Sequence, residues 1–140
     1  MRGPEEGHRE RLPKFDLRSN QGWIDSYGTI PYRIRYSITT SDIVSDKDPG
    51  RNMITPNTGG GFSLSVFIHK SVPKHFRQAV LLHELKEAEY MYGEERLEQK
   101  EAHKKAAQEA DSYAQKYLSQ DEYRAYKEWK STLIDPFSVS

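Results

Sequence analysis

Two segments of the chain alternate regularly between apolar and polar residues. In residues 31–40, and again in residues 62–70, every second side chain is apolar. Successive side chains of a β-strand point to opposite faces, so this two-residue period predicts a strand with one buried face in each segment. The apolar positions are Tyr32, Ile34, Tyr36 and Ile38 in the first segment and Phe62, Leu64, Val66 and Ile68 in the second.

The segments around these strands lack a sustained apolar period. Residues 41–61 collect Ser, Asp, Asn, Pro and Gly, which predicts a long surface loop, and loops of this length are uncommon unless they have a function. Residues 1–15 combine charge with Gly and Pro, so we expect a flexible tail. Residues 16–140 are expected to form a single domain.

From about residue 73 the apolar spacing changes to that of helices. Residues 73–92 predict a first helix, and residues 94–118, which carry a stripe of alanines, predict a second. Ser119 and Glu122 have the spacing of a capping box, which predicts a third helix that ends near residue 131. The expected fold is therefore α+β, with a small twisted N-terminal sheet packed on three C-terminal helices.

Composition excludes several classes of protein and site. The chain has 140 residues, with 21 Lys and Arg against 21 Asp and Glu, so we expect neither nucleic acid nor a membrane surface as a partner. It has no cysteine, which excludes disulfides and thiolate metal ligands. No window approaches the roughly 18 apolar residues of a membrane span, and the N-terminus lacks the apolar core of a secretory signal. A cytoplasmic location is expected.

The first predicted helix contains the sequence HELKE at residues 83–87. Its spacing places His83 and Glu87 one turn apart on the same face, where they could clamp a divalent cation. Glu84 points about 100° further around the helix, in position to reach a metal-bound water without being a ligand itself. This is the arrangement that a metal-dependent hydrolase needs.

A catalytic zinc site has three protein ligands and an open position for water, so a third ligand must come from another element. His103 belongs to the small-residue stripe of the second predicted helix, and a histidine on a packed stripe points inward. We therefore predict that His83, Glu87 and His103 bind Zn²⁺ or another divalent transition metal. Glu109 and Asp111 on the same helix are alternative ligands or partners of the ligating histidines.

The opposing interpretation of His83 and Glu87 is a surface ion pair on a charged helix. Such pairs are common and contribute almost nothing to stability. However, His83 directly follows the apolar run at residues 79–82, so it lies beside the most apolar part of its helix rather than on a solvated face. The pattern favours the metal site.

The order strand, strand, histidine-bearing helix and second helix, over about residues 23–115, resembles the zincin-like metallopeptidases. Their active-site helix carries H-E-x-x-H, and Glu87 stands where that motif has its second histidine. The resemblance implies a metal-dependent peptide hydrolase in which Glu84 activates a zinc-bound water. In that family the strand before the active-site helix is a sheet edge that pairs with the extended substrate, and residues 62–69 have that place here.

An interpretation from another class also stays open. It is a non-catalytic, degenerate zincin-like module that binds an extended peptide or protein by strand addition. Both interpretations expect a peptide or protein partner, and metal content separates them, because stoichiometric zinc favours the enzyme. For the enzyme, the candidates to hold the oxyanion are Tyr90, Tyr92 and Tyr113.

Overall fold

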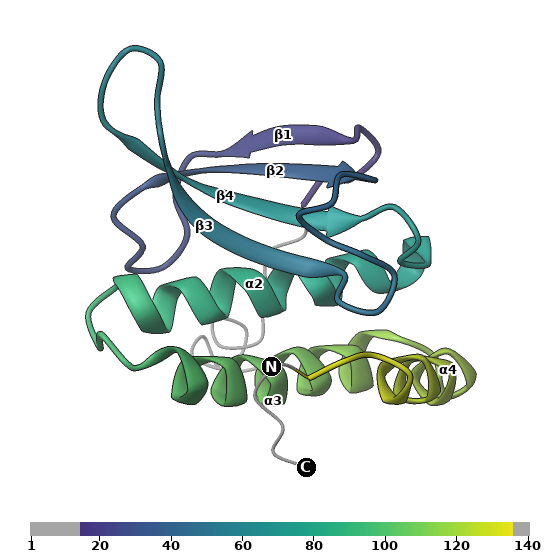
Figure 1. The fold of residues 1–140 in the computed structure, drawn as a ribbon. Coiled ribbons are helices and arrows are strands. Elements are labelled where there is room, and N and C mark those ends of the chain that lie inside the picture. Colours follow the sequence, from purple (N-terminus) through teal and green to yellow (C-terminus); the bar gives the residue numbers. More distant parts are fainter. Residues whose placement is uncertain (1–14, 136–140) are drawn as a thin grey trace, which may run out of the picture.

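A computed structural model describes residues 15–135, in which four strands are followed by three α-helices (Figure 1). The predicted tail therefore lies outside the described residues except for Phe15. The strands are β1 (Gln21–Ile24), β2 (Arg33–Thr39), β3 (Gly50–Pro56) and β4 (Phe62–His69). A short 3₁₀ turn, η1 (Lys74–Phe76), leads into the helices α2 (Arg77–Tyr92), α3 (Gln99–Tyr117) and α4 (Gln120–Ser131).

The sheet has the strand order β1-β2-β4-β3, which makes β4 an inner strand. It pairs in parallel with β2 and antiparallel with β3, so the prediction that residues 62–69 form a sheet edge is wrong. Leu64, Val66 and Ile68 are fully buried, as expected for a strand that is covered by neighbours on both sides. Among residues 15–135, the free edges of this sheet belong to β1 and β3.

The strand β3 occupies residues 50–56, so the predicted surface loop over residues 41–61 is wrong for that stretch. A glycine-containing turn joins β3 to β4 as a hairpin, in which the Asn57 N–H donates to the Gly61 carbonyl over 2.8 Å. Gly60 and Gly61 have φ angles of 103° and 78°, a region that favours glycine. This hairpin covers the edge of β4 that the sequence pattern left free.

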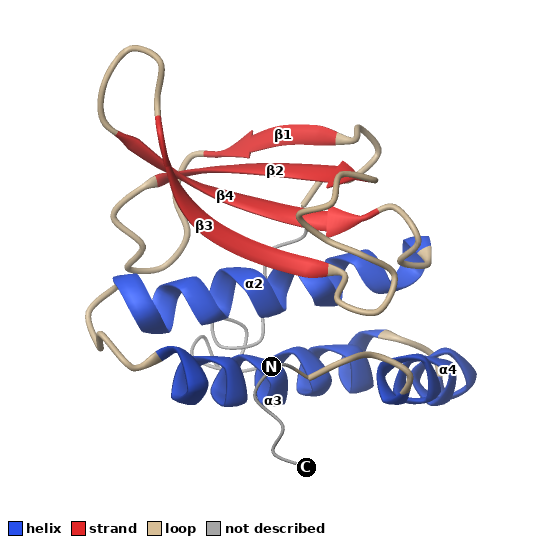
Figure 2. Ribbon diagram, in the orientation of Figure 1, coloured by secondary structure: helices blue, strands red, loops and turns tan. Residues whose placement is uncertain are grey.

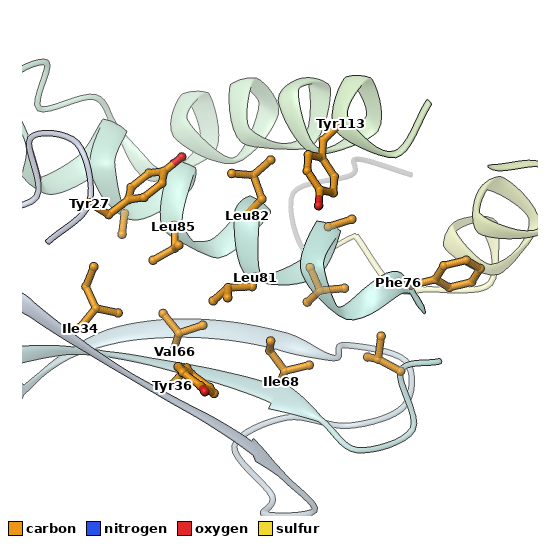
Figure 3. Packing of buried hydrophobic residues seen from close by; sticks show 14 of the residues in the cluster. Tyr27, Ile34, Tyr36, Val66, Ile68, Phe76, Leu81, Leu82, Leu85 and Tyr113 are labelled. Carbon is orange, nitrogen blue, oxygen red and sulfur yellow. The ribbon is translucent and has the colours of Figure 1, made fainter. Parts of the chain in front are cut away.

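The helix α2 lies between two layers (Figure 2). One side packs on the sheet and the other on α3, while α4 follows at the end of α3. Figure 3 shows Leu81 of α2 facing Val66 and Ile68 of the sheet, whereas Leu82 lies on the opposite side, toward α3 and its Tyr113. The α+β fold class is thus confirmed, with the three helices forming further layers rather than all contacting the sheet.

Two local features of the helices also agree with the sequence. Ser119 and Glu122 form the predicted capping box at the start of α4, because each side chain accepts a hydrogen bond from the backbone N–H of the other. Among the helices of residues 15–135, none is long and apolar enough to cross a membrane.

Candidate metal centre

The central helix α2 buries ionisable side chains as well as apolar ones. His83, Glu84 and Glu87 keep only 8%, 6% and 5% of their surface exposed. Burying polar groups is costly unless they are paired or bind a ligand, so three such residues within five positions of one helix indicate a site.

These residues line a cleft of about 670 Å³. Its walls come from the β3 edge, from α2 and α3, from Tyr126, Trp129 and Lys130 of α4, and from the segment that follows α4. That segment is anchored across the molecule, because the Ile134 N–H donates to the Lys47 carbonyl over 2.8 Å. The cleft therefore combines elements that are distant in the sequence.

The structure brings His83, Glu87 and His103 together, as the sequence predicted. Nε2 of His83 lies 3.3 Å from Nδ1 of His103, and that Nδ1 lies 2.9 Å from Oε2 of Glu87. One ligand atom from each residue falls within 4.8 Å of the other two. Metal–nitrogen bonds of about 2.0–2.1 Å in tetrahedral geometry place ligand atoms about 3.3 Å apart. Two of the three pairs of ligand atoms are at or below this spacing, and the third lies within 4.8 Å, so small side-chain shifts would bring all three onto one divalent metal of the size of zinc.

Close contact between α2 and α3 makes this convergence possible. Ala102, Ala106, Ala110 and Ala114 of α3 are completely buried, so small side chains fill the helix interface. The two imidazole rings, one from each helix, meet at 69° with their centroids 4.8 Å apart. Small interface residues let the helices approach until the two histidines meet.

Burial keeps His83 uncharged. It lowers the pKa of His83 to about 3, with smaller contributions from the charges of Lys130 and His103. An uncharged imidazole has a lone pair for a metal, and His83 directs Nε2 toward the cluster. Its Nδ1 is buried and has no hydrogen-bond partner among residues 15–135, so His83 lacks the outer acceptor that most ligating histidines have.

His103 has an outer carboxylate that the sequence pattern does not predict. Its Nε2 lies 3.5 Å from Oδ1 of Asp135, in the segment after α4. The two expected candidates for a ligand or partner are engaged elsewhere, because Glu109 accepts from the Tyr90 hydroxyl and Asp111 accepts from the Tyr123 hydroxyl. Asp135 therefore has the outer position expected of Glu109 or Asp111.

Glu84 lies beside the three converging residues. Its Oε1 accepts a 2.7 Å hydrogen bond from Nδ2 of Asn52, and the same Nδ2 donates to Oε1 of Glu87 over 2.9 Å. Burial, followed by the nearby charge of Glu87, raises the pKa of Glu84 to about 8. A carboxyl group with a pKa near neutrality is suited to accept and return a proton.

The predicted oxyanion candidates do not line the cleft. Tyr90 is bonded to Glu109, Tyr113 is buried in the core, and Tyr92 also lies outside the cleft. The cation in the α4 wall is Lys130, whose pKa is lowered by burial. The sequence shows only that Lys130 follows Tyr126 by four residues, which places both on the same face of α4.

Asn52 is the other functional candidate that the sequence pattern does not reveal, because it lies in the supposed loop. The turn residues 57–61, with their three glycines, are a hairpin signal that would have placed Asn52 on a strand.

Comparison of the chain with protein-family models, with curated proteins and with solved structures finds no match.

Proposed function

We propose that this chain is a metal-dependent peptide hydrolase whose metal is held by His83, Glu87 and His103. The observation that supports the proposal is the convergence of two imidazole nitrogens and one carboxylate oxygen beside a second buried carboxyl group, Glu84. Two histidines and one glutamate form a ligand set that suits zinc. When bound, a divalent metal supplies a Lewis acid that lowers the pKa of a coordinated water.

The residues around the metal have separate roles in this proposal. Glu84 is the general base, which takes a proton from the attacking water and returns it to the leaving amine. Lys130 offers a positive charge to the oxygen of the scissile carbonyl, the role first expected of a tyrosine. Both side chains line the same cleft as the three ligands.

The substrate edge in this proposal is β3 instead of residues 62–69. The Pro49 carbonyl accepts from the His69 N–H over 2.7 Å. In an antiparallel pair every second residue directs its backbone N–H and C=O groups toward the partner strand, so this bond fixes which residues of β3 bond to β4. By that alternation, the backbone groups of Gly50, Asn52 and Ile54 point away from β4 toward the free edge. Since this edge borders the cleft, an extended peptide paired with it would pass the ligand cluster.

Replacing Ile54 with Pro tests this pairing, because it removes one edge N–H and spares the bonds to β4. We expect peptide affinity to fall about 2- to 12-fold, the equivalent of one hydrogen bond of roughly 0.5–1.5 kcal/mol. Calorimetry would use the zinc-loaded Glu84→Gln protein and a peptide found by library cleavage. Ile54→Val is the matched control, and equal affinity in the two variants would argue against strand pairing.

A second prediction uses the contact between Gly50 and Glu84. A Cβ atom at residue 50 would lie 2.6 Å from Oε2 of Glu84, so Gly50→Ala must displace that carboxyl group. Because a misplacement of about 1 Å can cost on the order of 100-fold in rate, we expect about that loss of hydrolysis with zinc content unchanged. Gly59→Ala is the control, since a Cβ there meets nothing within 4 Å. Equal cleavage rates in the two variants would contradict the role of Glu84.

The free β3 edge also supports the non-catalytic interpretation, in which a peptide binds and is not cut. Incubating the zinc-loaded protein with a broad peptide library, with and without a chelator, separates the two functions. The proposed hydrolase produces cleavage that the chelator abolishes. Peptide binding without any cleavage would favour the interaction module.

A further inference from the structure

The side-chain amide of Asn52 joins the proposed base to a proposed ligand. Its Nδ2 donates to Oε1 of Glu84 over 2.7 Å and to Oε1 of Glu87 over 2.9 Å. An amide nitrogen has two hydrogens, so these bonds use its full donor capacity. With the nitrogen facing both groups, the amide can donate to each of them in its ionised form, because the oxygens of an ionised carboxylate only accept.

The bond to Asn52 divides the two oxygens of Glu87 between two partners. Oε1 faces the amide, and Oε2 lies 2.9 Å from Nδ1 of His103, on the side where the ligand atoms converge. A carboxylate that is held in this way can offer one oxygen to a metal. Without the amide, Glu87 could turn and offer both oxygens, which would occupy the position that a catalytic site keeps open for water.

The surroundings of Asn52 argue against a role in packing alone. Its Oδ1 is buried and has no hydrogen-bond partner among residues 15–135, which is unfavourable for the fold. The neighbouring inward positions of β3 are Gly50 and Ile54, which lie in register with β4 and carry no polar side chain. The two carboxyl acceptors therefore account for a half-buried amide whose buried oxygen is unsatisfied.

We propose that Asn52 is a positioning residue that restricts Glu87 to one-oxygen coordination and holds Glu84 beside the metal. The inference rests on the proposed metal site and extends it to a residue of the β3 edge. It does not require that the substrate be known, because metal binding itself reports the effect.

Cobalt titration of the purified chain tests this role, since Co²⁺ fits zinc sites and its visible bands report coordination number. In Asn52→Leu, which has no donors, we expect Co²⁺ affinity to fall about 10- to 100-fold, the usual effect of losing an outer-shell partner. We also expect weaker visible bands, because centres with five or six ligands absorb less than tetrahedral ones. Asn52→Gln restores an amide, and we expect it to recover part of both signals.

Asn57→Leu is the matched control, because Asn57 lies in the turn of the same hairpin and bonds to Ser63 outside the cleft. We expect it to match the parent in affinity and spectrum. If Asn52→Leu does not fold, Asn52→Ser is titrated instead with the same expectation. Unchanged affinity and spectrum in a folded Asn52 variant would overturn this inference alone. A parent chain that binds no Co²⁺ would overturn the metal site as well.

Discussion

Glu84→Gln is expected to abolish peptide hydrolysis while zinc remains bound. The substitution preserves the size of the side chain and an oxygen that can accept from Asn52, and it removes the group that is proposed to take the proton. General acid–base groups contribute roughly 10²- to 10⁴-fold in rate, so we expect kcat to fall by about that factor. The measurement is the cleavage rate of a library-derived peptide, together with the zinc content of the same sample.

The matched control for this experiment is Glu94→Gln, an exposed glutamate just after α2 that does not line the cleft. It should leave both cleavage and zinc content unchanged. If Glu84→Gln cleaved as fast as Glu94→Gln, another group would have to be the base. If Glu84→Gln lost its zinc, the separation between base and ligands would be wrong.

His103→Ala is expected to release the metal. It removes one of the three proposed ligands, and the loss should exceed the 10- to 100-fold that an outer-shell change costs in affinity. Metal binding to the folded state stabilises a protein by about 2.7 kcal/mol at a free concentration 100 times Kd, so zinc should raise the melting temperature of the parent and not of the variant. Thermal unfolding with and without zinc provides the measurement.

His75→Ala serves as the control for His103→Ala. His75 is exposed in η1 and does not line the cleft, so its loss should leave the zinc-dependent stabilisation intact. The same zinc-dependent stabilisation in His103→Ala as in His75→Ala would rule out His103 as a ligand.

Much of the fold could be predicted from periodicity. The alternation around Ile34 and Val66 predicts two strands, because each strand aligns apolar side chains that lie in the hydrophobic core. The proximity of His83, Glu87 and His103 was predictable as well. A four-residue spacing fixes two side chains on one helix face, and a stripe of alanines marks where a second helix approaches.

The remaining features could not be predicted because glycine and polar residues interrupt the apolar pattern there. Two of the inward positions of β3 are Gly50 and Asn52, which face Glu84 and Glu87 and interrupt the apolar alternation of a strand. Because the apolar pattern does not indicate β3, it places residues 62–69 at an edge of the sheet. Asp135 was equally hidden, because its contact with His103 depends on how the segment after α4 crosses the molecule.

Metal analysis of the purified chain tests the central claim most directly. The protein is loaded with zinc, dialysed extensively and analysed by mass spectrometry for bound metal, alongside a variant in which His83, Glu87 and His103 are all alanine. We predict one zinc ion per chain in the parent and none in the variant. A folded parent chain without stoichiometric metal, or a variant that retains it, would contradict the proposed site.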